Sequence, residues 1–295
     1  MNKVSIVNRN IYPLRGSLIP LKIVDGGFAH CEYSGNPLPP TAFSKYIVWD
    51  RNVSEFEDVV FYTDDDLLKP QPGHSKRIAW LSEPICKQPF IYNWISQNHH
   101  LYDYVLTNEK ELLDMGEKFI FYPQTSSWIE VNLRKVDHKK TKLVSIIVSD
   151  KNKEGTDHWK RHEIVKRYGD RIDVMGRGYK PIEPMSVGLI DYMFNIGMEN
   201  QARDFHFTAN ILNPILVGTI PIYYGMDSID EFFDTRGLIL FKEVSDVGEI
   251  LKEIGPKLYQ SMLPYAKENF KIGQKYILQE DWMYENGVFE KMGVL

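Results

Sequence analysis

The chain of 295 residues is 43% hydrophobic and 25% charged, which is typical of a soluble globular protein long enough for two packed domains. Its 35 basic and 40 acidic side chains leave a formal charge of −5, which argues against a general nucleic-acid binder. Two cysteines, Cys31 and Cys86, are too few for a disulfide framework, and no run is apolar enough for a signal peptide or a membrane span. We therefore expect a soluble, cytoplasmic protein without an integral membrane segment.

The first half of the chain contains short strand-like runs separated by polar segments. The runs lie at residues 4–7, 46–49, 59–62, 77–81, 104–106 and 119–122. The segments 54–59 and 108–118 favour helices. Thr63 stands before three aspartates, which is typical of the capped start of a helix.

The second half begins after the charged segment 133–142, which we interpret as a linker between domains. Strands are expected at 142–149, 171–175, 192–199, 220–225 and 237–241, and helices at 157–169, 207–218 and 246–255. This alternation predicts a parallel, doubly wound sheet. The domain boundaries that follow are 1–135 and 136–275. Residues 276–295 form a C-terminal helix that can pack back on the first domain.

Turns that leave the strands of the second half are candidate binding positions, because doubly wound sheets bind ligands outside the carboxyl ends of their strands. These turns span 149–155, 176–181, 197–204 and 223–228, and each of them contains glycine. The short GRGY turn, with Gly176 and Gly178, is not a dinucleotide fingerprint. Taken alone, it favours a tight strand-to-loop turn over a nucleotide site.

Two charged residues near these turns each allow two interpretations. Glu199 follows a strand, where a carboxylate can accept both hydroxyls of a ribose, but it also suits a helix cap or a loop salt bridge. Arg161 lies on the helix after the first strand of the second half. It can clamp a phosphate, or it can belong to a solvated basic face.

Metal and serine-hydrolase chemistry are poorly supported by the sequence. The aspartates after Thr63 offer carboxylates to a divalent ion but suit a helix cap better. His99 and His100 are adjacent, so they face different directions on any regular element. The chain has no GxSxG elbow.

The stretch FNIGMENQARDFHFTANILNPILVGTIPIYYG, residues 194–225, resembles the signature of the family 10 glycosyltransferases, the α-1,3/1,4-fucosyltransferases. Glu199 and Asn200 stand at the Glu-Asn of that signature, and Thr208 stands at its threonine. Upstream, residues 146–178 are similar to a second block of the family, in which Arg161 takes the position of the arginine that contacts the donor diphosphate. IAWLSEP, residues 78–84, resembles the element that supplies the family's proposed general base, and Glu83 is the candidate.

The resemblance has one departure. The family's helix begins Thr-Glu-Lys, with the lysine on the donor phosphates, whereas this chain has Thr208-Ala209-Asn210. The lost ammonium contact is worth about 1.5–3 kcal/mol at a typical site. Arg203, Lys180 or the N–H groups at the start of the helix are candidates to replace it.

The resemblance implies an α/β fold of the GT-B type, with two Rossmann-like doubly wound domains facing across a cleft. The first domain would bind an oligosaccharide or glycan acceptor, and the second a nucleotide-sugar donor, GDP-fucose. Transfer would invert the sugar, with Glu83 as base, Arg161 on the diphosphate, and no metal or other cofactor. The implied donor site comprises Glu199, Asn200, Arg203, Thr208, Asn210, Gly176, Gly178, Lys180 and Tyr224.

Three alternatives stay open at this point. The enzyme can use another nucleotide sugar, because Ala209 and Asn210 remodel the pocket. The chain can be a non-catalytic nucleotide-sugar or glycan-binding homologue that has lost the family's lysine. It can also be an unrelated doubly wound nucleotide binder, which would require a first half of different fold.

Overall fold

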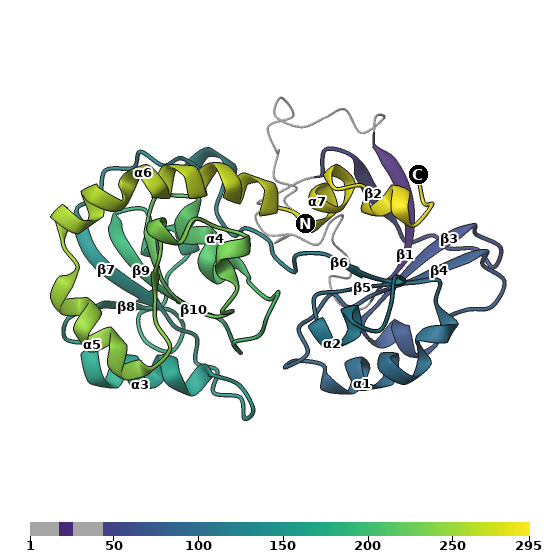
Figure 1. Ribbon diagram of the computed structural model, residues 1–295, viewed down its shortest axis with the longest axis horizontal. Coiled ribbons are helices and arrows are strands. Elements are labelled where there is room, and N and C mark those ends of the chain that lie inside the picture. Colours follow the sequence, from purple (N-terminus) through teal and green to yellow (C-terminus); the bar gives the residue numbers. More distant parts are fainter. Residues whose placement is uncertain (1–17, 26–43) are drawn as a thin grey trace, which may run out of the picture.

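Two parallel β-sheets, one in each lobe, form the framework of this computed structural model (Figure 1). The structure describes residues 18–25 and 44–295. Every neighbouring pair of strands is parallel in both sheets, so the carboxyl ends of the strands in each sheet share one edge. The expected α/β fold class is confirmed.

The sheet of the first lobe has the strand order β2-β1-β3-β4-β5-β6. Its strands are β1 (Ile19–Val24), β2 (Ile47–Asp50), β3 (Val59–Thr63), β4 (Lys76–Trp80), β5 (Tyr104–Thr107) and β6 (Phe119–Phe121). Strand β1 is not among the expected strands, because Pro20 and Lys22 interrupt its apolar run. The strand expected at 4–7 lies outside the described residues.

The helices of the first lobe differ most from the expectation. They are α1 (Pro89–Asn98), α2 (Lys110–Leu113), and the 3-10 helices η3 (Asp64–Leu68), η4 (His99–Leu101) and η5 (Val131–Leu133). Residues 54–59 form a turn and not a helix, and Thr63 makes no side-chain cap at η3. The ten-residue α1 is not foreseen, because its aromatic and β-branched residues favour a strand locally.

The sheet of the second lobe has the order β11-β10-β9-β7-β8. Its strands are β7 (Lys142–Ile147), β8 (Asp173–Met175), β9 (Tyr192–Met198), β10 (Ile220–Tyr224) and β11 (Ile239–Leu240). Its helices are α3 (His158–Tyr168), α4 (Ala209–Ile215), α5 (Val244–Glu253), α6 (Pro256–Gly273), and the 3-10 helices η6 (Met185–Gly188), η7 (Ile229–Glu231) and η8 (Thr235–Gly237). The 18-residue α6 is not among the expected helices.

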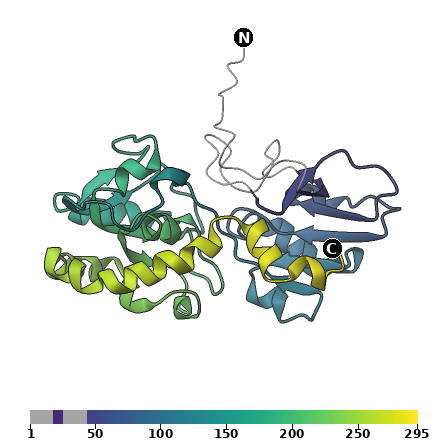
Figure 2. The same ribbon diagram turned by 90° about the horizontal axis from the view of Figure 1, so that it is seen from above.

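The chain returns to the first lobe after α6 (Figure 2). Its last elements are η9 (Gln274–Tyr276), α7 (Gln279–Glu285) and α8 (Val288–Lys291), with Gly287 at φ +67° between the two helices. The single C-terminal helix expected here is therefore broken into short pieces. Met283 and Phe289 are fully buried against the first sheet, and the Trp49 indole donates to Glu280 Oε1 at 3.0 Å.

Both faces of the first sheet are buried, which explains its nearly continuous hydrophobic strands. Phe61 and Trp80 pack on the face covered by α7 and α8, whereas Tyr62 and Ala79 pack on the face covered by α1. No helix within residues 18–25 and 44–295 is long and apolar enough to cross a membrane.

Candidate active site

Loops at the carboxyl ends of the two sheets contact each other between the lobes. Asn108 follows β5, and His206 lies in the segment between β9 and α4. The Nδ2 atom of Asn108 is 3.0 Å from the Nδ1 atom of His206. Lys153 follows β7, and Cys86 follows β4. The Lys153 ammonium donates to the carbonyl oxygen of Cys86 at 2.8 Å. Because parallel sheets bind ligands at this edge, the meeting place of these loops is the candidate site.

Glu199 immediately follows β9, and its carboxylate is saturated by protein donors. The residue is fully buried. Oε1 accepts from Thr208 N at 2.9 Å and from the Tyr223 hydroxyl at 3.1 Å; Oε2 accepts from Thr208 Oγ1 at 2.7 Å and from Asn210 Nδ2 at 3.0 Å. A ribose would have to displace these donors. The expected ribose contact therefore does not match this geometry, in which Glu199 anchors the start of α4.

Thr208 and Asn210 serve the same anchor. Thr208 is the N-cap of α4, and its Oγ1 also accepts from Asn210 N at 3.2 Å. The helix is only seven residues long, and the N–H groups of Thr208 and Asn210 are already bonded within the protein. The sequence suggested that N–H groups at the start of α4 could bind a phosphate. In this structure the N–H groups of Thr208 and Asn210 are not free to do so.

Arg161 extends from the first turn of α3 towards the end of β9. Its Nη2 donates to the Met198 carbonyl and, at 3.0 Å, to Asn200 Oδ1. Burial lowers the pKa of Arg161, but a guanidinium stays charged in proteins. The side chain is thus a half-buried cation held by protein acceptors and not part of a solvated helix face.

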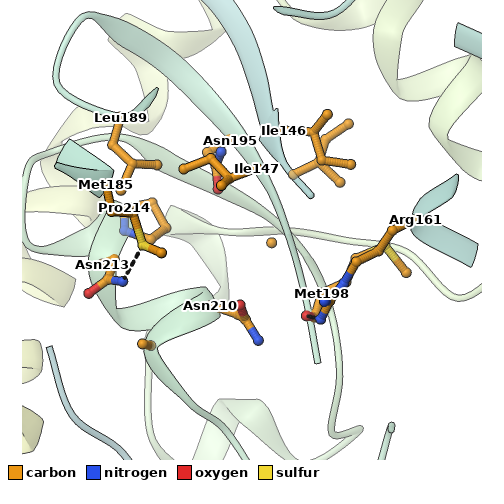
Figure 3. Close-up of a pocket in the computed structure, with 13 residues that line it drawn as sticks. Ile146, Ile147, Arg161, Met185, Leu189, Asn195, Met198, Asn210, Asn213 and Pro214 are labelled. Atoms are coloured by element: carbon orange, nitrogen blue, oxygen red, sulfur yellow. Dashed lines mark hydrogen bonds between the residues drawn. The ribbon is translucent and has the colours of Figure 1, made fainter. Parts of the chain in front are cut away.

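A pocket beside Arg161 is lined by polar and apolar side chains (Figure 3). Arg161 and Met198 lie at one side of it, Asn213 and Met185 lie at the other, and Asn210 lies between them. The pocket combines the carboxamides of Asn210 and Asn213 and the guanidinium of Arg161 with apolar side chains. This lining suits a polar ligand with hydrogen-bonding groups at its periphery.

His158 is a site residue that the sequence analysis did not identify. Its Nε2 lies 3.0 Å from Asn200 Oδ1, and Lys153 N donates to its Nδ1 at 3.2 Å. The proton therefore sits on Nε2, and burial lowers the pKa of the ring, so it is neutral at pH 7. His158 and Arg161 are three positions apart on α3, the spacing that places two side chains on one helix face. Together they fix the Asn200 side chain.

Tyr224, at the end of β10, belongs to a second charged cluster. Its hydroxyl donates to Asp157 Oδ2 at 3.0 Å and accepts from Lys160 Nζ at 2.8 Å. The ammonium also lies 4.3 Å from the centre of the tyrosine ring, within cation–π range. Lys160 adds a second cation at the carboxyl edge of the sheet, next to Arg161 in sequence.

The glycine turn after β8 is explained by its backbone. Gly176 has φ +108°, and a Cβ there would lie 2.1 Å from the Val148 carbonyl oxygen, so only glycine fits. Gly178 and Lys180 are exposed. The Tyr179 hydroxyl lies 3.0 Å from His162 Nδ1 and ties the turn to α3. The tight-turn interpretation accounts for these glycines without a ligand.

Arg203 is paired with the first lobe. Its Nε donates to Glu109 Oε2 at 2.8 Å, and Nη2 contacts Glu109 and, at 3.3 Å, Glu111. Glu109 is buried, and burial raises its pKa despite the guanidinium. In this conformation Arg203 bridges the lobes, and its expected role in place of the missing lysine stays a prediction.

Glu83 lies three residues beyond β4, and its carboxylate accepts a hydrogen bond from Lys87. Lys87 Nζ is 2.5 Å from Oε2, and about a third of the Glu83 side chain is exposed (33%). It is therefore open to a substrate hydroxyl in a way that Glu199 is not.

The backbone that carries Glu83 is, in contrast, firmly held. We call residues 81–83 the base turn. Its three carbonyl oxygens each accept from a side chain: that of Leu81 from Tyr122 at 2.6 Å, that of Ser82 from Gln124 at 2.5 Å, and that of Glu83 from Tyr92 at 2.8 Å. Nothing in the local sequence indicates these partners, which come from other elements.

Metal-binding geometry is not found in the part of the chain that the structure describes. No group of three or more His, Cys, Asp or Glu side chains there is placed to hold an ion. Asp64, the first of the three aspartates, is buried, whereas Asp65 is exposed. These carboxylates therefore do not converge on one point.

Comparison with known proteins finds similarity in structure only. No protein-family model matches the chain, and no curated protein sequence matches it. A solved α1,3-fucosyltransferase with GDP superposes with a TM-score of 0.57 at 19% identity, over 90% of this chain and 92% of that one. The fold is that of the GT-B glycosyltransferases.

Two further solved structures share this fold. An α1,3-fucosyltransferase with GDP-fucose matches with a TM-score of 0.52 at 16% identity, over 88% of this chain and 90% of that one. An α-glucosyltransferase in complex with UDP and a 13-mer DNA matches with a TM-score of 0.51 at 10% identity, over 80% of each chain. The fold neighbours are thus glycosyltransferases with different donors.

Proposed function

We propose that the protein is an inverting glycosyltransferase that moves fucose from GDP-fucose to a hydroxyl of a glycan. The observation that carries the proposal is that an accessible carboxylate and a half-buried cation lie on segments of the two lobes that contact each other. Glu83 and Arg161 follow strands of different sheets, on loops or helix starts that meet between the lobes. The likeness to α1,3-fucosyltransferases over nine-tenths of both chains supports it.

In this mechanism, Glu83 accepts the proton of the acceptor hydroxyl as its oxygen attacks the anomeric carbon. Attack comes from the face opposite the nucleoside diphosphate, so the configuration inverts. A positioned base contributes about 10²–10⁴-fold to such a step. The rigid backbone of the base turn supports this role, because it fixes the carboxylate without consuming its acceptor capacity.

Arg161 would stabilise the negative charge that collects on the leaving diphosphate. Its Nη2 is used by Met198 and Asn200, whereas no contact of Nη1 or Nε with another described residue competes for a phosphate oxygen. Guanidinium donors in a planar fork suit a diphosphate. In this proposal protein cations, and not a metal ion, provide the charge, with Lys160 as the second cation near the site.

A second candidate is the same reaction with another nucleotide sugar. It is favoured by Asn210, which stands where the fucosyltransferases have lysine and whose amide is bound to Glu199. The α-glucosyltransferase with UDP shows that the fold also accommodates a uridine donor in another protein.

Donor identity is tested by calorimetric titration of GDP and UDP, followed by a donor screen read by product mass. We expect GDP to bind, and fucose to be the transferred mass. Binding of UDP without GDP would replace the fucosyl proposal by the second candidate. Binding without transfer to any acceptor in a glycan panel would indicate a non-catalytic homologue.

Arg161→Met and Lys166→Met form a matched pair on α3. Lys166 is 80% exposed and lies only near Glu163, at 4.0 Å. Loss of Arg161 should weaken GDP binding about 10–100-fold, because a charge-assisted contact is worth about 1.5–3 kcal/mol. Lys166→Met should bind within about twofold of wild type, since exposed ion pairs contribute little. Equal affinities in both variants would exclude Arg161 from the donor site.

Glu83→Gln is compared with Glu117→Gln, a change at an exposed position of the same lobe. The first should lower transfer about 10²–10⁴-fold while GDP affinity stays unchanged. The second should retain wild-type transfer. Full activity of Glu83→Gln would remove Glu83 from the mechanism.

A further inference from the structure

Asp64 is a buried carboxylate beside the candidate active site that the proposed reaction does not yet use. It immediately follows β3, the neighbour of β4, and is 3% exposed. The Ser82 hydroxyl lies 3.0 Å from each of its two oxygens. At these distances the hydroxyl hydrogen-bonds to the Asp64 carboxyl group.

The backbone at Asp64 has an unusual conformation. Its φ is +51°, a region that residues other than glycine seldom adopt and that aspartate tolerates better than most. Such conformations persist only where the surroundings hold them, and they cluster at functional sites. Here the chain bends directly after β3 and brings the carboxylate to Ser82 in the base turn.

The charges around Asp64 come from few groups. Burial raises the pKa of Asp64, and the hydrogen bond from Ser82 opposes that shift. Lys87 is paired with Glu83. Tyr92 and Tyr122 are neutral, because burial raises the pKa of each well above its usual value.

We propose that Asp64 is a positioning residue for Glu83: by holding the Ser82 hydroxyl it fixes the base turn that carries Glu83. This inference rests on the proposed function. In this proposal Asp64 acts only through Ser82 and the base turn and contacts neither donor nor acceptor.

Three variants test this role: Asp64→Asn, Ser82→Ala and Ser82→Thr. Turnover is measured as GDP release from GDP-fucose with a panel of neutral disaccharides, and GDP affinity by calorimetry. Asp64→Asn and Ser82→Ala should each lower kcat about 10-fold, as misplaced groups do, with GDP affinity within about twofold. Ser82→Thr keeps the hydroxyl and should restore turnover.

Rescue of turnover by Ser82→Thr, with GDP affinity unchanged, is the outcome that a merely structural role of Ser82 would not give. Wild-type kcat in Asp64→Asn would overturn the inference. If Asp64→Asn does not fold by circular dichroism, the serine variants decide: lost turnover in alanine with rescue in threonine supports it, and wild-type turnover in alanine overturns it.

Failure of the inference is distinguishable from failure of the proposed function. If Glu83→Gln is inactive while Asp64→Asn equals wild type, only the role of Asp64 is lost. If Glu83→Gln retains full transfer, the proposed base is wrong, and the inference about Asp64 is overturned with it.

Discussion

Glu83 and Glu199 occupy similar places in the two lobes and differ in how the protein holds them. Each follows a parallel strand at the carboxyl edge of its sheet. Glu199 has four protein donors on its carboxylate and no exposure. Among the described residues, the Glu83 carboxylate has one hydrogen-bond partner, Lys87, whereas the carbonyls of its turn are fixed by side chains.

The difference shows that position in the fold does not assign a role to a carboxylate. A saturated, buried carboxylate organises its own lobe and has no acceptor capacity left for a substrate. A carboxylate on a fixed backbone with an open side chain is prepared for proton transfer. Motif resemblance alone does not separate the two cases, because both residues belong to motifs.

The largest expected effect comes from Glu199→Ala. It should lower the free energy of unfolding by about 3–5 kcal/mol, because it leaves several buried donors unpaired. Urea denaturation measures this, with Glu83→Gln as the control that should stay within about 0.5 kcal/mol of wild type. Similar losses in both variants would break the contrast between the two carboxylates.

An intermediate effect is expected at Glu109, the carboxylate after β5 that pairs with Arg203 across the lobes. Arg203→Met should lower the free energy of unfolding by about 2 kcal/mol at neutral pH, because Glu109 is left buried without its partner. Burial already raises the pKa of Glu109 above 4.5. Protonation relieves the unpaired charge, so the loss should shrink as the pH falls through that raised value. A loss that is constant between pH 7 and pH 4 would contradict the assignment.

The smallest effect is expected for Lys87→Met. Among the described residues, Lys87 is the partner of the Glu83 carboxylate, and both side chains are partly exposed. Exposed ion pairs contribute about 0–1 kcal/mol, so the urea midpoint should hardly change. A loss comparable to that of Glu199→Ala would mean that Glu83 is also a structural anchor.

The sequence indicates the alternation of strands and helices well, because buried parallel strands are continuous apolar runs. It misses β1, whose Pro20 and Lys22 break the pattern, and α1, whose composition resembles a strand. In these segments the tertiary setting overrides local propensity.

For the candidate site, the sequence locates Arg161, Glu83 and the β9–α4 segment but not their partners. Tyr223 meets Glu199 from the next strand, and Glu109 meets Arg203 from 94 residues away. Such contacts depend on how the lobes pack and leave no local signal. The roles expected of Glu199 and Arg203 therefore differ from those that the structure supports.

The return of α7 and α8 to the first lobe has a consequence for the order of synthesis. Domains generally fold as they leave the ribosome, the N-terminal one first. Here Met283 and Phe289, which pack on one face of the first sheet, are made only after the entire second lobe. The lobe whose strands appear first is thus the last to be completed. A nascent chain that stops after α6 should therefore have a folded second lobe, whereas the first lobe lacks part of its hydrophobic core and is prone to aggregate.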